Sequence, residues 1–166
     1  GDTAQPNGED GIVFQCAGPG NCADNNVIFN NDIVWNAGNG ISLWGPLSGN
    51  TIGSDNYIAH NGYTGILSVL PGDTNWIGGN TISANGTYGI ELSGSSAPVS
   101  NNDILDNTGW GIVVMPYYSG TYDQAGAGDD VVAVPLIDTN VINGNGGGGI
   151  ISQDSEPANG STLHDD

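Results

Sequence analysis

The sequence predicts an all-β fold, a single-stranded parallel β-helix of about six coils. A segment with the skeleton Asn-x-Ile-x-x-Asn-x-x-x-Gly-Ile recurs along the chain, and its clearest copy is NTISANGTYGIEL at 80–92. The Gly-Ile pairs lie at 11/12, 40/41, 65/66, 89/90, 111/112 and 149/150, which are intervals of 29, 25, 24, 22 and 38 residues. A repeat of this length is typical of a solenoid.

Each repeat has room for three short strands. Ile90 and Leu92 alternate around Glu91, and a period of two indicates a strand rather than a helix. A further Asn-x-Ile precedes three of the repeats, beginning at Asn26, Asn50 and Asn75. Three strands of roughly 3–5 residues with their turns use about 22–25 residues, which is one coil of a β-helix.

Stacked coils bring equivalent residues into columns about 4.8 Å apart. Two columns of isoleucine are expected in the interior, at 33, 58, 82, 104 and 142 and at 41, 66, 90, 112 and 150. One corner is expected to carry an asparagine ladder, bonded side chain to side chain, formed by Asn36, Asn61, Asn85, Asn107 and Asn145. The glycine of each Gly-Ile pair is expected to supply the conformational freedom of another tight corner.

We expect a single domain over 1–166. Residues 1–24 would form an N-terminal cap and first coil, 25–152 the coils, and 153–166 a polar C-terminal tail. The segment 116–135 interrupts the repeat and explains the longest interval, so we expect it to protrude as a loop.

The segments NTIGSDNYIAHNGYTGILSV (50–69) and NWIGGNTISANGTYGIELSG (75–94) resemble secreted right-handed parallel β-helix repeat proteins. The resemblance covers roughly 25–114 and returns at 138–152. The resemblance implies the fold but not the function, because this repeat serves lyases, hydrolases, epimerases, adhesins and surface proteins alike. Pectate lyases and uronate epimerases of the fold use Arg or Lys with anionic substrates, and this chain has neither.

The charge balance excludes several partners. The chain has no Lys or Arg against 18 acidic residues, a formal net charge of −18. Nucleic acids and anionic membrane surfaces are attracted by basic side chains, so neither is expected to bind. No apolar run approaches the roughly 18 residues of a membrane-spanning helix, so insertion into a membrane is not expected. Cations are the natural small partners.

Cys16 and Cys22 flank the segment AGPGN. The two residues predict either a small disulfide loop or two free thiols, and a disulfide would indicate an oxidising compartment. Together with a chain that begins at Gly1 without Met, the sequence is interpreted as a mature protein, secreted or at the cell surface, from which a leader peptide has been removed.

Four aspartates lie within or just after the inserted segment: Asp123, Asp129, Asp130 and Asp138. Carboxylate oxygens suit Ca²⁺, so the sequence predicts either a calcium site, with Ca²⁺ the one cofactor considered, or a solvated acidic loop. Asn85-Gly-Thr and Asn159-Gly-Ser fit the N-glycosylation pattern, although Asn85 is also expected in the ladder.

Three aromatic residues lie close to the Gly-Ile pairs: Tyr63, Tyr88 and Trp110. Aromatic side chains in one corner could form a platform for sugar rings, a subunit contact or local packing.

Glu91, Asp103 and Asp106 lie on neighbouring coils and are candidate acid–base residues. His60 shares a column with Asp106 but lies two coils away, about 9–10 Å, which is too far for a His–Asp pair. The sequence therefore does not identify a catalytic residue.

Two functions fit these observations. The first is a non-enzymatic secreted structural protein, a self-assembling subunit of an extracellular filament, sheath or surface layer, which associates through its terminal arms because open sheet edges pair with other chains. The alternative is a carbohydrate-binding or carbohydrate-active module, similar to glycan hydrolases or lyases, for neutral glycans or for acidic glycans bridged by Ca²⁺.

Overall fold

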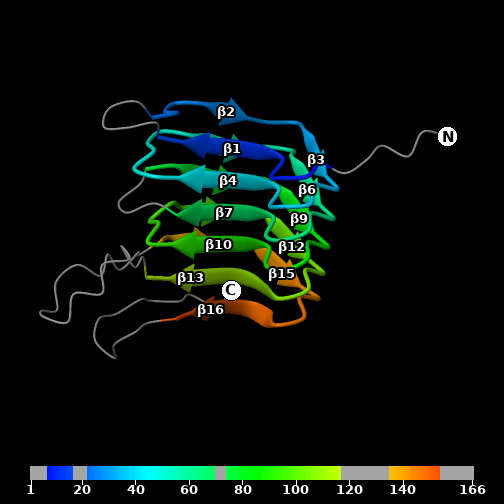
Figure 1. Cartoon of the computed structure of the whole chain (residues 1–166). Helices are drawn as coiled ribbons and strands as arrows, with labels where there is room; N and C mark the ends of the chain where they lie inside the picture. The colour runs from blue at the N-terminus through cyan, green and yellow to red at the C-terminus, as the bar shows by residue number, and fades with distance from the viewer. Residues whose placement is uncertain (1–6, 17–21, 70–73, 117–134, 154–166) are drawn as a thin grey trace, which may run out of the picture.

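The computed structural model describes residues 7–16, 22–69, 74–116 and 135–153. Across these residues the chain winds into a right-handed parallel β-helix in which every strand pairs in parallel with the equivalent strand of the next coil (Figure 1). One coil contributes one strand to each of three sheets and is called a rung below. The described residues contain strands and turns and no helix, so no helix there could cross a membrane.

Sheet A contains six strands, stacked from β1 near the top of Figure 1 to β16 at the bottom. They are β1 (Ile12–Gln15), β4 (Ile41–Trp44), β7 (Ile66–Val69), β10 (Ile90–Ser93), β13 (Trp110–Met115) and β16 (Gly148–Ser152). Sheet B contains β2 (Val27–Ile28), β5 (Thr51–Gly53), β8 (Trp76–Gly78), β11 (Val99–Ser100) and β14 (Ile137–Asp138). Sheet C contains β3 (Asp32–Val34), β6 (Tyr57–Ala59), β9 (Thr81–Ser83), β12 (Asp103–Leu105) and β15 (Val141–Asn143).

Inward-facing aliphatic residues fill the space between the sheets. In sheet A the register aligns Ile41, Ile66, Ile90 and Ile112, and each of these side chains is fully buried. In sheet C, Ile58, Ile82 and Ile104 are aligned and equally buried. β-branched side chains pack well on a pleated surface. The predicted fold class and the interior isoleucine columns are confirmed.

The glycine before each interior isoleucine is needed for space rather than for an unusual backbone angle. A Cβ on Gly65 would lie 2.5 Å from Ile82 Cγ2, 2.7 Å from the carbonyl oxygen of Gly89 and 2.9 Å from Asn85 Nδ2. Gly65 is not among the positive-φ residues. The expectation of a conformational role was therefore wrong, because the close approach of the next rung is what excludes a side chain.

Asparagine side chains connect the rungs at the corners. Asn61 Nδ2 donates to Asn85 Oδ1 in the next rung at 3.0 Å and to the Ile33 carbonyl in the preceding rung at 3.1 Å. The same bonds recur along the predicted ladder from Asn36 to Asn145. A second ladder, not predicted, follows sheet B and contains Asn31, Asn56, Asn80, Asn102 and Asn140.

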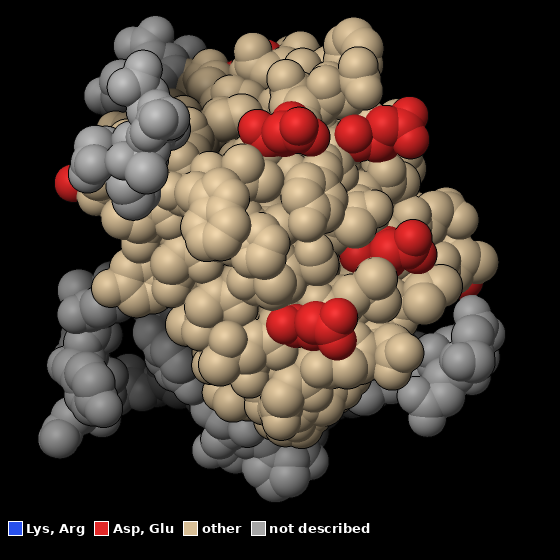
Figure 2. All heavy atoms as spheres, turned by 90° about the vertical axis from the view of Figure 1, so that its right-hand side faces the viewer, with Lys and Arg blue, Asp and Glu red and all other residues tan. Residues whose placement is uncertain are grey.

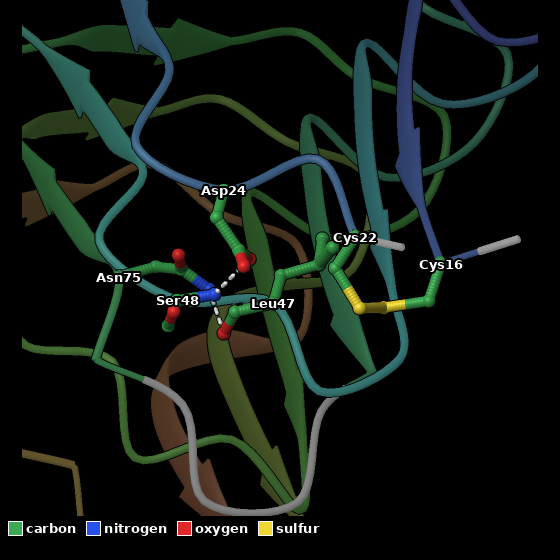
Figure 3. The surroundings of a disulfide bond; sticks show 6 residues. All are labelled: Cys16, Cys22, Asp24, Leu47, Ser48 and Asn75. Carbon is green, nitrogen blue, oxygen red and sulfur yellow. Dashed lines mark hydrogen bonds between the residues drawn. A yellow bond between two sulfur atoms is a disulfide. The ribbon is translucent and has the colours of Figure 1, made fainter. Parts of the chain in front are cut away.

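Cys16 and Cys22 form a disulfide (Figure 3). Both cysteines are half-buried against the hydrophobic core, and the bond lies close to Leu47, which is 1% exposed. Beyond it, the carboxylate of Asp24 accepts a hydrogen bond from the backbone N–H of Ser48 at 2.8 Å. The disulfide thus closes a short loop within the segment between β1 and β2.

Most of the predicted loop 116–135 and nearly all of the tail 153–166 lie outside the described residues. The division into cap, coils and tail within one domain of 1–166 therefore stays a prediction.

Candidate functional site

The candidate site lies on the outward face of sheet A, around Glu91. In β10, Ile90 and Leu92 point into the core and are fully buried, which turns Glu91 outward. Its partners in register are Leu67 of β7 and Val113 of β13. Both are buried, at 9% and 1% exposed, so the acidic side chain stands between two apolar ones.

This environment changes the acidity of Glu91. Burial raises the pKa of its carboxyl from the ordinary value of 4.5, and a hydrogen bond from the Thr64 side chain opposes the shift without cancelling it. Removal of a carboxylate from water disfavours its charged form. A carboxyl group that keeps its proton to higher pH can act as a general acid, and a perturbed pKa is a marker of functional sites.

A hydrogen-bonded chain connects Glu91 to a second carboxylate, Asp10. The carboxylate of Asp10 accepts from the Asn39 N–H and from the Ser42 hydroxyl, both at 2.6 Å. Asn39 Oδ1 accepts from the Thr64 N–H at 2.9 Å, and Thr64 bonds to Glu91. Ser42 lies two rungs from Glu91 in the register of sheet A, and Asp10, which directly precedes β1, lies one rung further away.

Tyr88 and Trp110 lie at the corner that leads into sheet A, Tyr88 in the rung of Glu91 and Trp110 in the next rung. Each directly precedes a Gly-Ile pair, and their backbones align because Gly65 N–H and Gly89 N–H donate to their carbonyls. Both rings lie against glycines of the following rung. A Cβ on Gly109 would meet Tyr88 Cδ1 at 2.8 Å, and one on Gly148 would meet Trp110 Cζ3 at 2.6 Å. Each ring is half-buried, packed on one side and partly open to solvent.

The structure aligns two residues of the predicted aromatic platform, Tyr88 and Trp110, but not the third, Tyr63. Tyr63 lies one residue earlier in the corner than Tyr88, because its carbonyl accepts from the Thr87 N–H. Its side chain is 58% exposed. Tyr88 and Trp110 therefore belong to the candidate site, Tyr63 lies beside their column, and a binding role for any of them stays a prediction.

The other acid–base candidates lie on a different face. Asp103 and Asp106 are exposed on and after β12 of sheet C, so the structure does not bring them together with Glu91. His60 instead stacks on Trp35, with ring centroids 4.4 Å apart. Figure 2 views the side on which sheet C lies in Figure 1 and shows separate acidic side chains on an otherwise uncharged surface.

Of the predicted calcium ligands, Asp123, Asp129 and Asp130 lie outside the described residues, and Asp138 is exposed at the end of β14. Within the described residues there is no group of three or more His, Cys, Asp or Glu that could hold a metal ion. A calcium site stays a prediction.

The structure argues against glycosylation of Asn85. The side chain is 0% exposed, and its amide donates to the Ile58 carbonyl and to Asn107 Oδ1. Asn159, the other candidate, lies outside the described residues.

Asp10, Asn39 and Thr64 were not identified from the sequence, although the signal was present. Each directly precedes a Gly-Ile pair, as Tyr88 and Trp110 do. Alignment of the repeats on that pair would have placed all five in one column beside Glu91.

Comparisons with known proteins agree with this architecture. The family model described as "Right handed beta helix region" matches residues 3–163. No curated protein matches the chain. Among solved structures, a double mutant of the periplasmic alginate epimerase AlgG matches with a TM-score of 0.72 and 24% sequence identity. The match covers 90% of this chain and 34% of the epimerase chain, so the chain spans about a third of that protein.

These findings contradict the first functional interpretation, a non-enzymatic structural subunit. A solved structure that shares the fold is an enzyme named for its action on a carbohydrate, which favours the alternative interpretation. The physical reason for the error is that open sheet edges, from which assembly was inferred, occur in any β-helix and do not distinguish a filament subunit from an enzyme.

Proposed function

Because the chain belongs to the family of right-handed β-helix proteins, we propose that it is a carbohydrate-active module. It binds a glycan at the half-buried side chains of Glu91, Tyr88 and Trp110 on the outward side of sheet A and cleaves it with Glu91 as the proton donor. The observation that carries the proposal is the half-buried carboxyl of Glu91, which stands between the buried side chains of Leu67 and Val113 and whose pKa is raised by burial. The similarity to an alginate epimerase supports a carbohydrate as the ligand.

The charge of the chain favours a glycan without acidic groups. There is no Lys or Arg to pair with a carboxylate or sulfate on the ligand, and the net charge of −18 repels anions. Abstraction of a proton next to a sugar carboxylate needs a positive group or hydrogen-bond donors to stabilise the anion that forms. Protonation of a glycosidic oxygen needs only a carboxylic acid, and Glu91 supplies one.

Two carboxylates are sufficient for glycoside hydrolysis. The proton of Glu91 passes to the leaving oxygen as the bond from that oxygen to the anomeric carbon breaks. In such enzymes the second carboxylate takes a proton from the water molecule whose oxygen bonds to the anomeric carbon. Inverting enzymes place the two carboxyl groups about 6.5–9.5 Å apart. Asp10 directly precedes β1 and lies three rungs from Glu91 of β10, a spacing of about 14 Å that exceeds this range, so the proposal assigns only the proton donor, Glu91.

The proposed compartment is extracytoplasmic, with the chain secreted. The Cys16–Cys22 disulfide suits an oxidising environment, and the solved structure of the same fold is a periplasmic protein.

The proposal is tested by incubating the protein with a panel of neutral, amino-sugar and acidic polysaccharides and measuring new reducing ends. We expect cleavage of a polysaccharide without acidic groups, and a loss of about 10²–10⁴-fold in Glu91→Gln. Asp24→Asn removes the same charge elsewhere and keeps the Oδ1 that accepts from Ser48, so it should retain activity. Equal rates for Glu91→Gln and the parent would refute the role of Glu91.

A further inference from the structure

The outward face of sheet C carries aromatic side chains that the reaction at Glu91 does not use. Trp35 is 62% exposed and Tyr57 is 39% exposed. The rings of Trp35 and His60 stack with an interplanar angle of 9° and centroids 4.4 Å apart. The stack holds the indole in place while most of its surface stays open to solvent.

Neither backbone conformation nor burial explains a tryptophan at this position. Trp35 and His60 have φ of 59° and 57°, and the residues at the same corner of the next two rungs, Ala84 and Asp106, have φ of 52° and 54°. The corner therefore requires the left-handed conformation in each of these rungs. Gly and Asn adopt it readily and a bulky side chain does not. Trp35 instead places a large apolar ring in water, where a ligand can use it.

Carboxylates stand at both ends of this aromatic surface. Asp32 is in register with Tyr57, and Asp103 lies two rungs further along the same column. Asp106 follows Ala84 in the column of Trp35 and His60. All three carboxylates are exposed. The chain has no Lys or Arg that could pair with them.

We propose that the outward face of sheet C is a second binding surface, and that it takes a chain of amino sugars with free ammonium groups. A pyranose ring packs on the Trp35 indole, and an ammonium group is attracted both to aromatic faces and to the carboxylates that flank them. The proposal rests on the proposed function only in taking a glycan as the ligand. It does not require Glu91, which faces outward from a different sheet.

The test compares two probes by isothermal titration calorimetry: a glucosamine oligomer and the fully N-acetylated oligomer of the same length, at a mildly acidic pH and low ionic strength. The glucosamine oligomer should bind at least about tenfold more tightly, and the difference should shrink as salt is added. Trp35→Ala should weaken binding about tenfold or more. Phe29→Ala, a matched aromatic that is 63% exposed beyond β2, should not.

Charge variants separate a site from general attraction to an acidic protein. Asp103→Asn should weaken binding of the glucosamine oligomer and leave the acetylated one unchanged, whereas Asp24→Asn should affect neither. Equal effects of Asp103→Asn and Asp24→Asn, or equal affinities for the two oligomers, would overturn the proposal. Loss of binding in Glu91→Gln but not in Trp35→Ala would place the ligand on sheet A, which overturns this proposal and leaves the proposed function standing. If binding requires Trp35 but activity is unchanged in Glu91→Gln, the proposal for sheet C stands and the proposed function is overturned.

Discussion

Asn61 and Asn85, one rung apart, are joined through a single oxygen atom: the backbone N–H and the Nδ2 of Asn61 both donate to Asn85 Oδ1, at 3.1 and 3.0 Å. Both side chains are buried. The repeating asparagine therefore satisfies backbone groups that the corner leaves without a strand partner, and it does so in the interior, where an unpaired polar group is costly.

Replacement of Asn85 tests this role. Asn85→Ala leaves two donors of Asn61 and the Ile58 carbonyl without their partner, and each buried unpaired group costs about 1–3 kcal/mol. We expect the free energy of unfolding to fall by on the order of 3 kcal/mol in a denaturant titration. Asn143→Ala, at an exposed position of β15, is the control and should change stability by less than about 0.5 kcal/mol. A similar small change for both variants would show that the ladder contributes little.

Gly65→Ala tests whether space limits the approach of the rungs. The added methyl group would lie within 3 Å of the Gly89 carbonyl oxygen and of Asn85 Nδ2, neither of which can move without disturbing the next rung. We expect a loss of about 1–3 kcal/mol, as for other overpacked interiors. Gly8→Ala is the matched control, because a Cβ there has nothing within 4 Å. Thermal unfolding of the two variants measures the difference, and a Gly65→Ala protein as stable as the parent would contradict the explanation.

The buried carboxyl of Glu91 should make stability depend on pH. Its pKa is raised from 4.5 in the folded chain, so folding is opposed by the cost of a buried charge at pH values above the folded pKa. That cost disappears as the pH falls through the folded pKa and the carboxyl becomes protonated in both states. Glu91→Gln removes the charge and keeps an acceptor for Thr64.

We therefore expect Glu91→Gln to unfold at a higher temperature than the parent near pH 7, with the difference vanishing below about pH 4. Asp24→Asn provides the comparison for removing one exposed charge from a protein of net charge −18. A difference between Glu91→Gln and the parent that is constant with pH, or that grows at low pH, would contradict the raised pKa.

The fold could be predicted from the sequence because each rung repeats the same physical requirements. Ile82 and Ile90 are interior and Asn85 is at a corner for reasons that apply again 22 residues later, at Ile104, Ile112 and Asn107. Repetition makes such requirements visible in a single sequence. The role of Gly65 was misinterpreted because the neighbour that excludes a side chain belongs to the next rung.

The candidate site could be predicted only in part. Glu91 was visible as an outward residue, but its link to Asp10 passes through three rungs and requires the register of sheet A. Glu91 and Asp103 lie on neighbouring coils in the sequence but on different sheets, in β10 and β12, which only the fold reveals. Trp35 and His60 each directly precede an asparagine of the ladder, so the repeat places them in one column, but the residue at this corner varies from rung to rung and their stacking was not predicted.

The central claim, that Glu91 donates a proton to a glycan on sheet A, is tested most directly by the pH dependence of kcat/KM for cleavage. The account predicts that the rate falls as the pH rises through a pKa above 4.5, the ordinary value for glutamate. It also predicts that this decrease of kcat/KM at high pH is absent from the residual activity of Glu91→Gln. If Glu91→Gln cleaves at a rate similar to that of the parent and kcat/KM falls at the same high pH in both proteins, the account is contradicted.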